Sequence, residues 1–79
     1  MVSAELVGRT LRGLRKDKRL TQEVLSGLAG LDRSHYSKIE RGLRSPTIDT
    51  LFKIAYAYGM HPHELMMLIE AAVETENEV

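Results

Sequence analysis

Cysteine is absent from this chain of 79 residues. Without a thiol, disulfide bonds, cysteine-ligated zinc and a cysteine nucleophile are all excluded. Long apolar runs are absent as well, because none approaches the ~20 residues of a membrane-spanning helix, and the N-terminus lacks the pattern of a signal peptide. We therefore expect one small domain, covering residues 1–79, that stays in the cytoplasm and has no membrane partner.

Catalytic patterns are missing too. The sequence shows no paired acid and base, no nucleophile constellation and no glycine-rich loop that would cradle a phosphate. His61, His63 and Glu64 form an H-x-H-E cluster, but no further strong ligand lies near it in sequence. We expect a helix cap and an exposed surface there rather than a metal site. The sequence thus predicts no enzyme activity, no cofactor and no metal.

Net charge is absent too, but the charged residues are unevenly distributed along the chain. The formal net charge is zero, yet residues 1–46 hold ten Lys or Arg against five Asp or Glu, and residues 47–79 hold one against six. A basic front and an acidic back suit a polyanion that approaches from one side. Runs of charge are often only solvated faces. We expect that interpretation for most of the first basic cluster, Arg12, Arg15, Lys16, Lys18 and Arg19.

Strand patterns are absent, and apolar periodicity separates five helical segments. They cover about residues 3–17, 21–30, 32–42, 47–59 and 61–73, with Thr21, Asp32 and Thr47 as N-caps and glycines at the C-terminal ends. The polar end TENEV is expected to fray. The positions with core spacing are Val7, Leu11, Leu14, Leu25, Leu28, Ala29, Tyr36, Ile39, Leu51, Ile54, Ala55, Tyr56 and Tyr58.

The second and third helices, about residues 21–42, have the spacing of a helix-turn-helix. Ser26 and Ala29 supply small residues where two helices cross, and Gly30 suits the turn. The free side of the third helix then carries donors for DNA, and the planar fork of Arg33 matches guanine O6 and N7. The predicted base contacts are Arg33, Ser34, Ser37 and Lys38. The predicted contacts to the DNA backbone are Gln22, His35, Arg41, Arg44 and Ser45, with Arg44 also suited to an adjacent minor groove.

The run TQEVLSGLAGLDRSHYSKIERGLRSPTIDTLFKIA resembles the DNA-binding domain of the lambda-repressor-like (Cro/C1, XRE) family of bacterial and phage regulators. LDRSHYSKIERGLRSPT is especially similar to the controller proteins of restriction–modification systems. The resemblance covers roughly residues 7–68. It implies an all-α, compact five-helix fold, double-stranded DNA as partner, a place on the bacterial or phage nucleoid, and contacts to bases or backbone by Arg33, Ser34, Ser37 and Arg44. Val24 stands where the family usually has Glu, so Glu23 is the remaining acidic candidate for a contact with RNA polymerase.

The fifth helix, about residues 61–74, has an apolar stripe wider than a small bundle needs to cover. Exposed apolar patches of this kind mark association sites, so we expect a homodimer that reads two half-sites about 34 Å apart. The predicted interface residues are Leu65, Met66, Leu68, Ile69, Ala72 and Val73. The sequence therefore predicts a transcriptional regulator that binds a pseudo-palindromic operator and controls its own promoter. An antitoxin or other protein-interaction module that also binds its promoter is the alternative.

Overall fold

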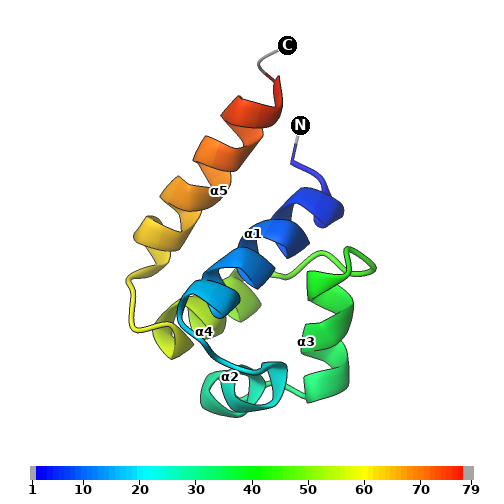
Figure 1. Ribbon diagram of the computed structural model, residues 1–79, viewed down its shortest axis with the longest axis vertical. Helices are drawn as coiled ribbons and strands as arrows, with labels where there is room; N and C mark the ends of the chain where they lie inside the picture. Colours follow the sequence, from blue (N-terminus) through cyan, green and yellow to red (C-terminus); the bar gives the residue numbers. More distant parts are fainter. Residues whose placement is uncertain (1, 78–79) are drawn as a thin grey trace.

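The computed structural model describes residues 2–77, and within them the chain forms five helices and no strand (Figure 1). The all-α architecture predicted from the sequence is confirmed. The helices are α1 (Ala4–Asp17), α2 (Gln22–Ala29), α3 (Arg33–Glu40), α4 (Ile48–Ala57) and α5 (Pro62–Asn77). No helix in this part of the chain is both long and apolar enough to cross a membrane.

Each of the first four helices begins at a side-chain cap. The side-chain oxygens of Ser3, Thr21, Asp32 and Thr47 accept hydrogen bonds from backbone N–H groups in the first turn. Such caps satisfy donors that have no partner inside the helix. The caps expected at Thr21, Asp32 and Thr47 are thereby confirmed.

The same four helices also end alike, in Schellman motifs. The first or second residue after each helix has a positive φ, and the N–H of the residue that follows it donates back to a carbonyl in the last turn. The positive-φ residues are Arg19, Gly30, Gly42 and Gly59. The residues that donate back are Leu20, Leu31, Leu43 and Met60.

One apolar core joins all five helices. Its fully buried large side chains are Leu11, Leu25, Tyr36, Ile39, Ile54 and Leu65. Two positions expected inside, Leu28 and Tyr56, are exposed instead, so those two expectations were wrong. Short helices bury only a narrow stripe, and α2 uses Leu25, Ser26 and Ala29 for it. Helical spacing alone does not reveal how wide the buried stripe is.

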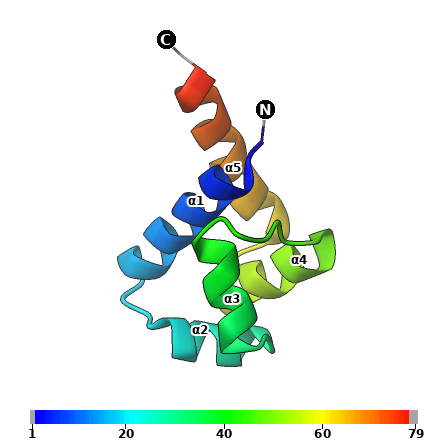
Figure 2. The ribbon, with the colours of Figure 1, turned by 90° about the vertical axis from the view of Figure 1, so that its right-hand side faces the viewer.

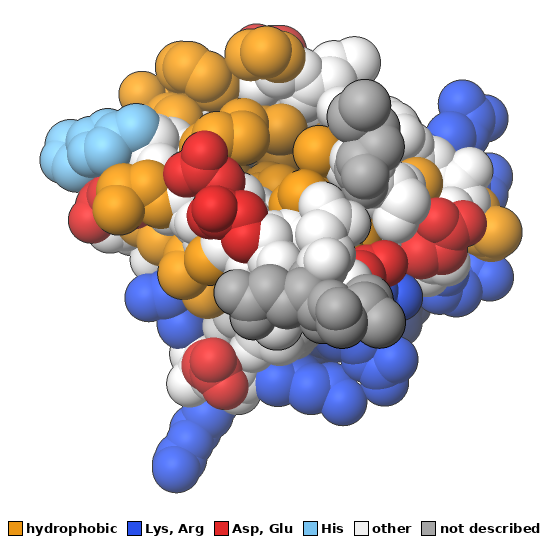
Figure 3. Space-filling model, turned by 90° about the horizontal axis from the view of Figure 1, so that it is seen from above, with side chains coloured by type: hydrophobic (Ala, Val, Ile, Leu, Met, Phe, Trp, Pro, Cys, Tyr) orange, Lys and Arg blue, Asp and Glu red, His pale blue; other side chains and the backbone are white. Residues whose placement is uncertain are grey.

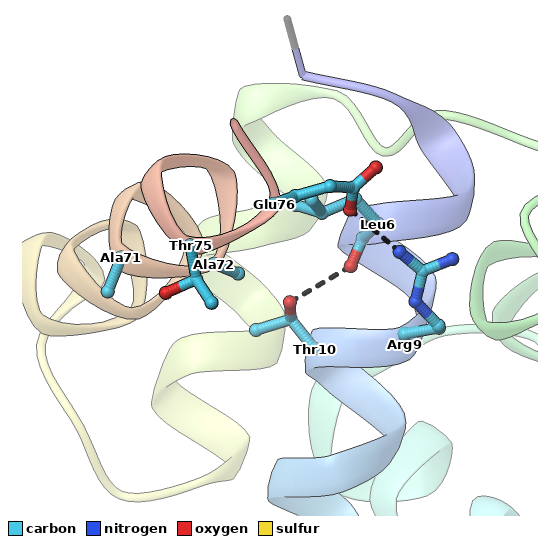
Figure 4. A pocket seen from close by; sticks show the side chains of 7 residues that line it. All are labelled: Leu6, Arg9, Thr10, Ala71, Ala72, Thr75 and Glu76. Carbon is cyan, nitrogen blue, oxygen red and sulfur yellow. Dashed lines mark hydrogen bonds and ion pairs between the residues drawn. The ribbon is translucent and has the colours of Figure 1, made fainter. Parts of the chain in front are cut away.

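Helices α1 and α5 lie side by side, while α2 and α3 lie at the end of the molecule farthest from the two termini (Figures 1 and 2). Helix α5 continues to Asn77. The expected end near Val73 and the expected fraying of the tail were therefore wrong for residues 75–77, and Glu78 and Val79 lie outside the described residues. The Nη2 atom of Arg9 on α1 donates to Glu76 Oε2 at 2.8 Å across a groove between the two helices (Figure 4).

Candidate nucleic-acid interface

The crossing of α2 and α3 depends on small residues, as the spacing predicted. Ser26 and Ala29 are buried, and Gly30 has φ 68° at the turn. A side chain would be strained at that φ, which is why glycine suits it. Leu25, Tyr36 and Ile39, which were predicted as core positions, are fully buried. The helix-turn-helix is thus a packed unit whose outer surface is free for other roles.

Helix α3 is held by a buried carboxylate at its C-terminal end. Glu40 accepts two hydrogen bonds from Arg15 on α1, from Nε at 2.6 Å and from Nη2 at 3.0 Å. The Nε2 atom of Gln22 on α2 donates to the same carboxylate at 3.0 Å. Burial alone would raise the pKa of Glu40, but the hydrogen bonds and the Arg15 charge outweigh it and lower the pKa below its ordinary value.

Arg15 also links this anchor to the turn after α1. Its Nη1 atom donates to the Leu20 carbonyl at 2.8 Å. Gly8 brings α1 close to the same region, because an added Cβ there would collide with the backbone carbonyls of Ile39 and Glu40. Two close contacts of different kinds, one polar and one steric, therefore set the position of α3 against α1.

A buried tyrosine pair continues the polar network into the core. The Tyr58 hydroxyl donates to the Leu11 carbonyl at 2.8 Å, so its single proton is used there. The Tyr36 hydroxyl, 3.2 Å away, is therefore the donor between the two tyrosines. Burial raises the pKa of Tyr36, and it raises the pKa of Tyr58 to about 12. Both hydroxyls stay neutral, and these hydrogen bonds orient α3 from its inner side.

The outer side of α3 borders a shallow hollow that brings most of the predicted DNA contacts together. Its lining residues are Gln22, Asp32, Arg33, Ser34, Ser37 and Arg41. Asp32 is committed to capping α3, since its Oδ2 atom accepts from the His35 N–H at 3.2 Å. His35 and Lys38 are half-buried and lie outside the hollow, whereas Arg44 and Ser45 are exposed in the segment after α3. The role of each of these side chains stays a prediction.

The cations of this surface have no acidic partner within the described residues. Within residues 2–77, the only Lys and Arg side chains that form ion pairs are Arg9, Arg15 and Lys53. The four cations on α3 and in the segment between α3 and α4 are Arg33, Lys38, Arg41 and Arg44. Viewed along the long axis, Lys and Arg side chains lie mainly along the lower and right-hand edges, and hydrophobic side chains gather mainly at the upper left (Figure 3). An unpaired basic surface of this kind suits a polyanion.

Two features of the interface were missed at the level of sequence. Arg15 belongs to the basic cluster that was expected to be mostly solvated, yet it is half-buried and pairs with the buried Glu40. Gln22 was assigned to a phosphate, and its amide donates one N–H to Glu40, which the sequence did not reveal. The second N–H of the amide and the backbone N–H groups at the start of α2 remain for the predicted phosphate contact. Arg15 follows Leu11 by one helical turn, so its place at the edge of the apolar stripe was the available signal.

The predicted association surface on α5 also changes. Leu65 and Ile69 are buried in the core of the single chain, and Ala72 and Val73 are half-buried against it. Those four residues therefore pack mainly against other parts of the same chain. Met66 and Leu68 remain exposed, together with Met67. Helix α4 adds an exposed stripe that was not predicted as part of the association surface, made of Ile48, Phe52 and Tyr56.

An apolar groove lies between these two helices. Ile48 and Phe52 from α4 and Met66 from α5 line it, with His63 at the start of α5. The Glu64 carboxylate accepts a hydrogen bond from the His61 N–H at 2.7 Å, which confirms the cap interpretation of the H-x-H-E cluster. The rings of His61 and His63 stack with centroids 5.5 Å apart.

The sequence profile of the helix-turn-helix family matches residues 11–65, which is more than half of the chain. The chain belongs to this helix-turn-helix family. Control protein C.MunI from a Mycoplasma species is 41% identical to it over 64 residues, which cover 80% of this chain and 86% of that protein. The chain is therefore a helix-turn-helix transcriptional regulator related to controller proteins, as the sequence predicted.

Two solved structures support the same relation. The restriction-modification controller protein C.AhdI from Aeromonas hydrophila has a TM-score of 0.74 and 42% identity, covering 78% of this chain and 94% of that one. Controller protein C.Esp1396I bound to a 25 base pair operator site has a TM-score of 0.81 and 27% identity, covering 89% of this chain and 92% of that one. That second helix-turn-helix protein is seen in complex with DNA.

Proposed function

We propose that this protein binds a specific DNA operator through α3 and regulates transcription from it. The observation that carries the proposal is the unpaired outer face of α3, where Arg33, Ser34 and Ser37 border one hollow beside the start of α2. A recognition helix of this kind enters the major groove with its first turns against base edges. The operator complex of C.Esp1396I supports this assignment.

Each polar side chain then has a role that follows from its chemistry. Arg33 in the first turn of α3 reads a guanine through two parallel hydrogen bonds. Ser34 and Ser37 donate to or accept from neighbouring base edges, and Lys38 reaches a base or phosphate from the flank of the helix. Backbone N–H groups at the start of α2 bind a phosphate, and Arg41, Arg44, Ser45 and His35 bind the flanking backbone.

The protein acts as a homodimer on a pseudo-palindromic site. Support comes from the groove between α4 and α5 and from the exposed apolar side chains beside it, Ile48, Phe52 and Met66. Methionine adapts well to association surfaces. Two copies joined there would present two α3 helices to successive major grooves and combine their binding energies. This surface replaces the buried residues Leu65 and Ile69 that the sequence pattern had predicted.

The protein controls its own promoter. This part of the proposal is supported by the likeness to controller proteins of restriction–modification systems. A regulator of this kind responds to its own concentration, because dimerisation and occupancy of the operator both rise with the amount of protein.

Selection of bound DNA from a random pool tests the function directly. The expected result is a two-fold symmetric sequence whose half-sites lie about one helical turn apart. Sedimentation of the protein at micromolar concentration is expected to show a dimer. Recovery of unrelated sequences without symmetry would reject the operator proposal, and a monomer that binds DNA equally well would reject the dimer alone. A reporter fused to the region upstream of the gene tests autoregulation.

A further inference from the structure

The four Schellman motifs differ in what their last residue does. In such motifs an apolar residue after the positive-φ position packs back onto the helix or the core. Leu20, Leu31 and Met60 follow this rule, because each is partly buried against the core. Leu43, after α3, does not, because this residue is 63% exposed. The same local motif therefore presents a leucine to solvent only beside the predicted recognition helix.

Leu43 is held in this exposed place by rigid surroundings. Its N–H donates to the Lys38 carbonyl at 2.9 Å. The preceding residue, Gly42, has φ 77°, and an added Cβ there would come within 2.9 Å of the Cα of Glu5. The turn is thus pressed against the first turn of α1. A leucine on a turn fixed at both sides has little freedom to fold back into the core.

The neighbours of Leu43 along the chain are cations. Arg41 and Arg44 flank it closely in sequence, both are exposed, and neither forms an ion pair within residues 2–77. When two such side chains approach the phosphates of one strand, an apolar side chain between them meets the surface that separates successive phosphates. That surface is the deoxyribose ring, whose C–H groups are apolar.

We propose that Leu43 packs against a deoxyribose of the DNA backbone, between the phosphates that Arg41 and Arg44 bind. The inference rests on the proposed DNA-binding function and adds a contact of a different chemical kind to it. Because the sugar is common to all nucleotides, the contact strengthens binding without reading sequence. Because it involves no charge, it releases no counterion and leaves the salt dependence of binding unchanged.

Leu43→Ala tests the contact, and Leu28→Ala is a matched control. Leu28 is also a leucine, it is also 63% exposed, and it lies on α2 away from the hollow beside α3. Dissociation constants are measured for the selected operator and for an unrelated duplex over a range of salt. Leu43→Ala is expected to weaken both by about the same factor, roughly tenfold. The slope of affinity against salt and the thermal melting point should stay those of the wild type, and Leu28→Ala should change nothing.

Other outcomes separate the inference from the function on which it rests. If the wild type selects no operator, the proposed function itself fails. If the wild type binds and Leu43→Ala binds as tightly, only the sugar contact is rejected. A loss confined to the operator, reproduced when one thymine is replaced by uracil, would move the contact to a thymine methyl and overturn the sugar assignment. A change in dimerisation measured by sedimentation would place Leu43 between protein copies and overturn it as well.

Discussion

Helices α3 and α5 each have one buried face and one face without a partner in the chain, but the two free faces are chemically opposite. On α3 the free face carries hydroxyls and unpaired cations, and on α5 it carries Met66, Met67 and Leu68. Their anchoring differs as well. Glu40, the last residue of α3, ties this helix to α1 and α2 through directional hydrogen bonds. Within the described residues, α5 is held by apolar packing and one exposed ion pair.

This contrast in anchoring matches the needs of the two surfaces. Hydrogen bonds to base edges require side chains whose positions are fixed to within a fraction of an ångström, so a helix that reads DNA benefits from a rigid polar anchor. Apolar association is not directional, and methionine adapts its shape to the partner. The polar network lies under the surface proposed for reading, and the adaptable side chains lie on the surface proposed for dimerisation.

Removing the anchor of α3 should have the largest effect. Arg15→Ala leaves the Glu40 carboxylate buried without its cation, and breaking a buried pair in this way costs about 3–5 kcal/mol. Chemical denaturation is expected to show that loss in the free energy of unfolding. Lys16→Ala, at the exposed neighbouring position, serves as control and should be nearly neutral. Equal stability of the two variants would show that the network does not hold α3.

A charge on the proposed dimer surface should break association without unfolding the chain. Phe52→Glu places a carboxylate in the groove of each copy, and like charges brought together there should raise the dimer dissociation constant about a hundredfold or more. Sedimentation measures the change, and circular dichroism checks the fold. Val24→Glu, an equally exposed apolar position on α2, is the matched control and should remain dimeric. A dimeric Phe52→Glu would place the interface elsewhere.

Loss of the first side chain of α3 should remove sequence discrimination at one base pair in each half-site. Arg33→Ala would delete the proposed two-bond contact to guanine, which should contribute about 1–3 kcal/mol of discrimination. Binding to operators with each base changed in turn measures this effect. Arg12→Ala on α1 should keep the full preference. If Arg33→Ala discriminates as the wild type does, another side chain reads that position.

Acid should weaken the α3 anchor in a defined range. The folded-state pKa of Glu40 lies below its ordinary value of 4.5. Its stabilisation is therefore complete at pH values well above 4.5 and is lost as the pH falls from there through the lower folded pKa. Thermal melting at a series of pH values should show this decline in the wild type. Glu40→Gln should start lower and decline less, and parallel curves for the two proteins would contradict the assignment.

The smallest effect is expected from the removal of one cation that is proposed to bind a phosphate. Arg41→Ala should weaken operator and unrelated DNA alike, and it should reduce the log–log salt slope by about one unit for each phosphate that is left without its arginine, which means one in each protomer. Lys53→Ala, whose side chain pairs with Asp49 on α4, should leave the slope unchanged. Leu43→Ala should differ from Arg41→Ala, because it should bind DNA more weakly than the wild type while the log–log salt slope stays unchanged.

Local sequence was enough to predict the order of the helices and the ends of α2 and α3. Caps and terminating glycines act within a few residues of themselves, so Thr21, Asp32, Gly30 and Gly42 predicted where α2 and α3 begin and end. Helical spacing likewise placed Tyr36 and Ile39 inside and left Arg33, Ser34 and Ser37 on the free side. These inferences succeeded because the forces behind them are local.

Tertiary packing alone determines which side chains are buried and which distant side chains pair with one another. Arg15 and Glu40 are 25 positions apart, and no local rule pairs them. Neighbouring helices likewise determine that Leu65 and Ile69 are buried while Leu28, Tyr56 and Leu43 are exposed. The physical reason is that burial depends on how closely another helix approaches. The extent of each buried stripe therefore belongs to the packed molecule and not to any single segment.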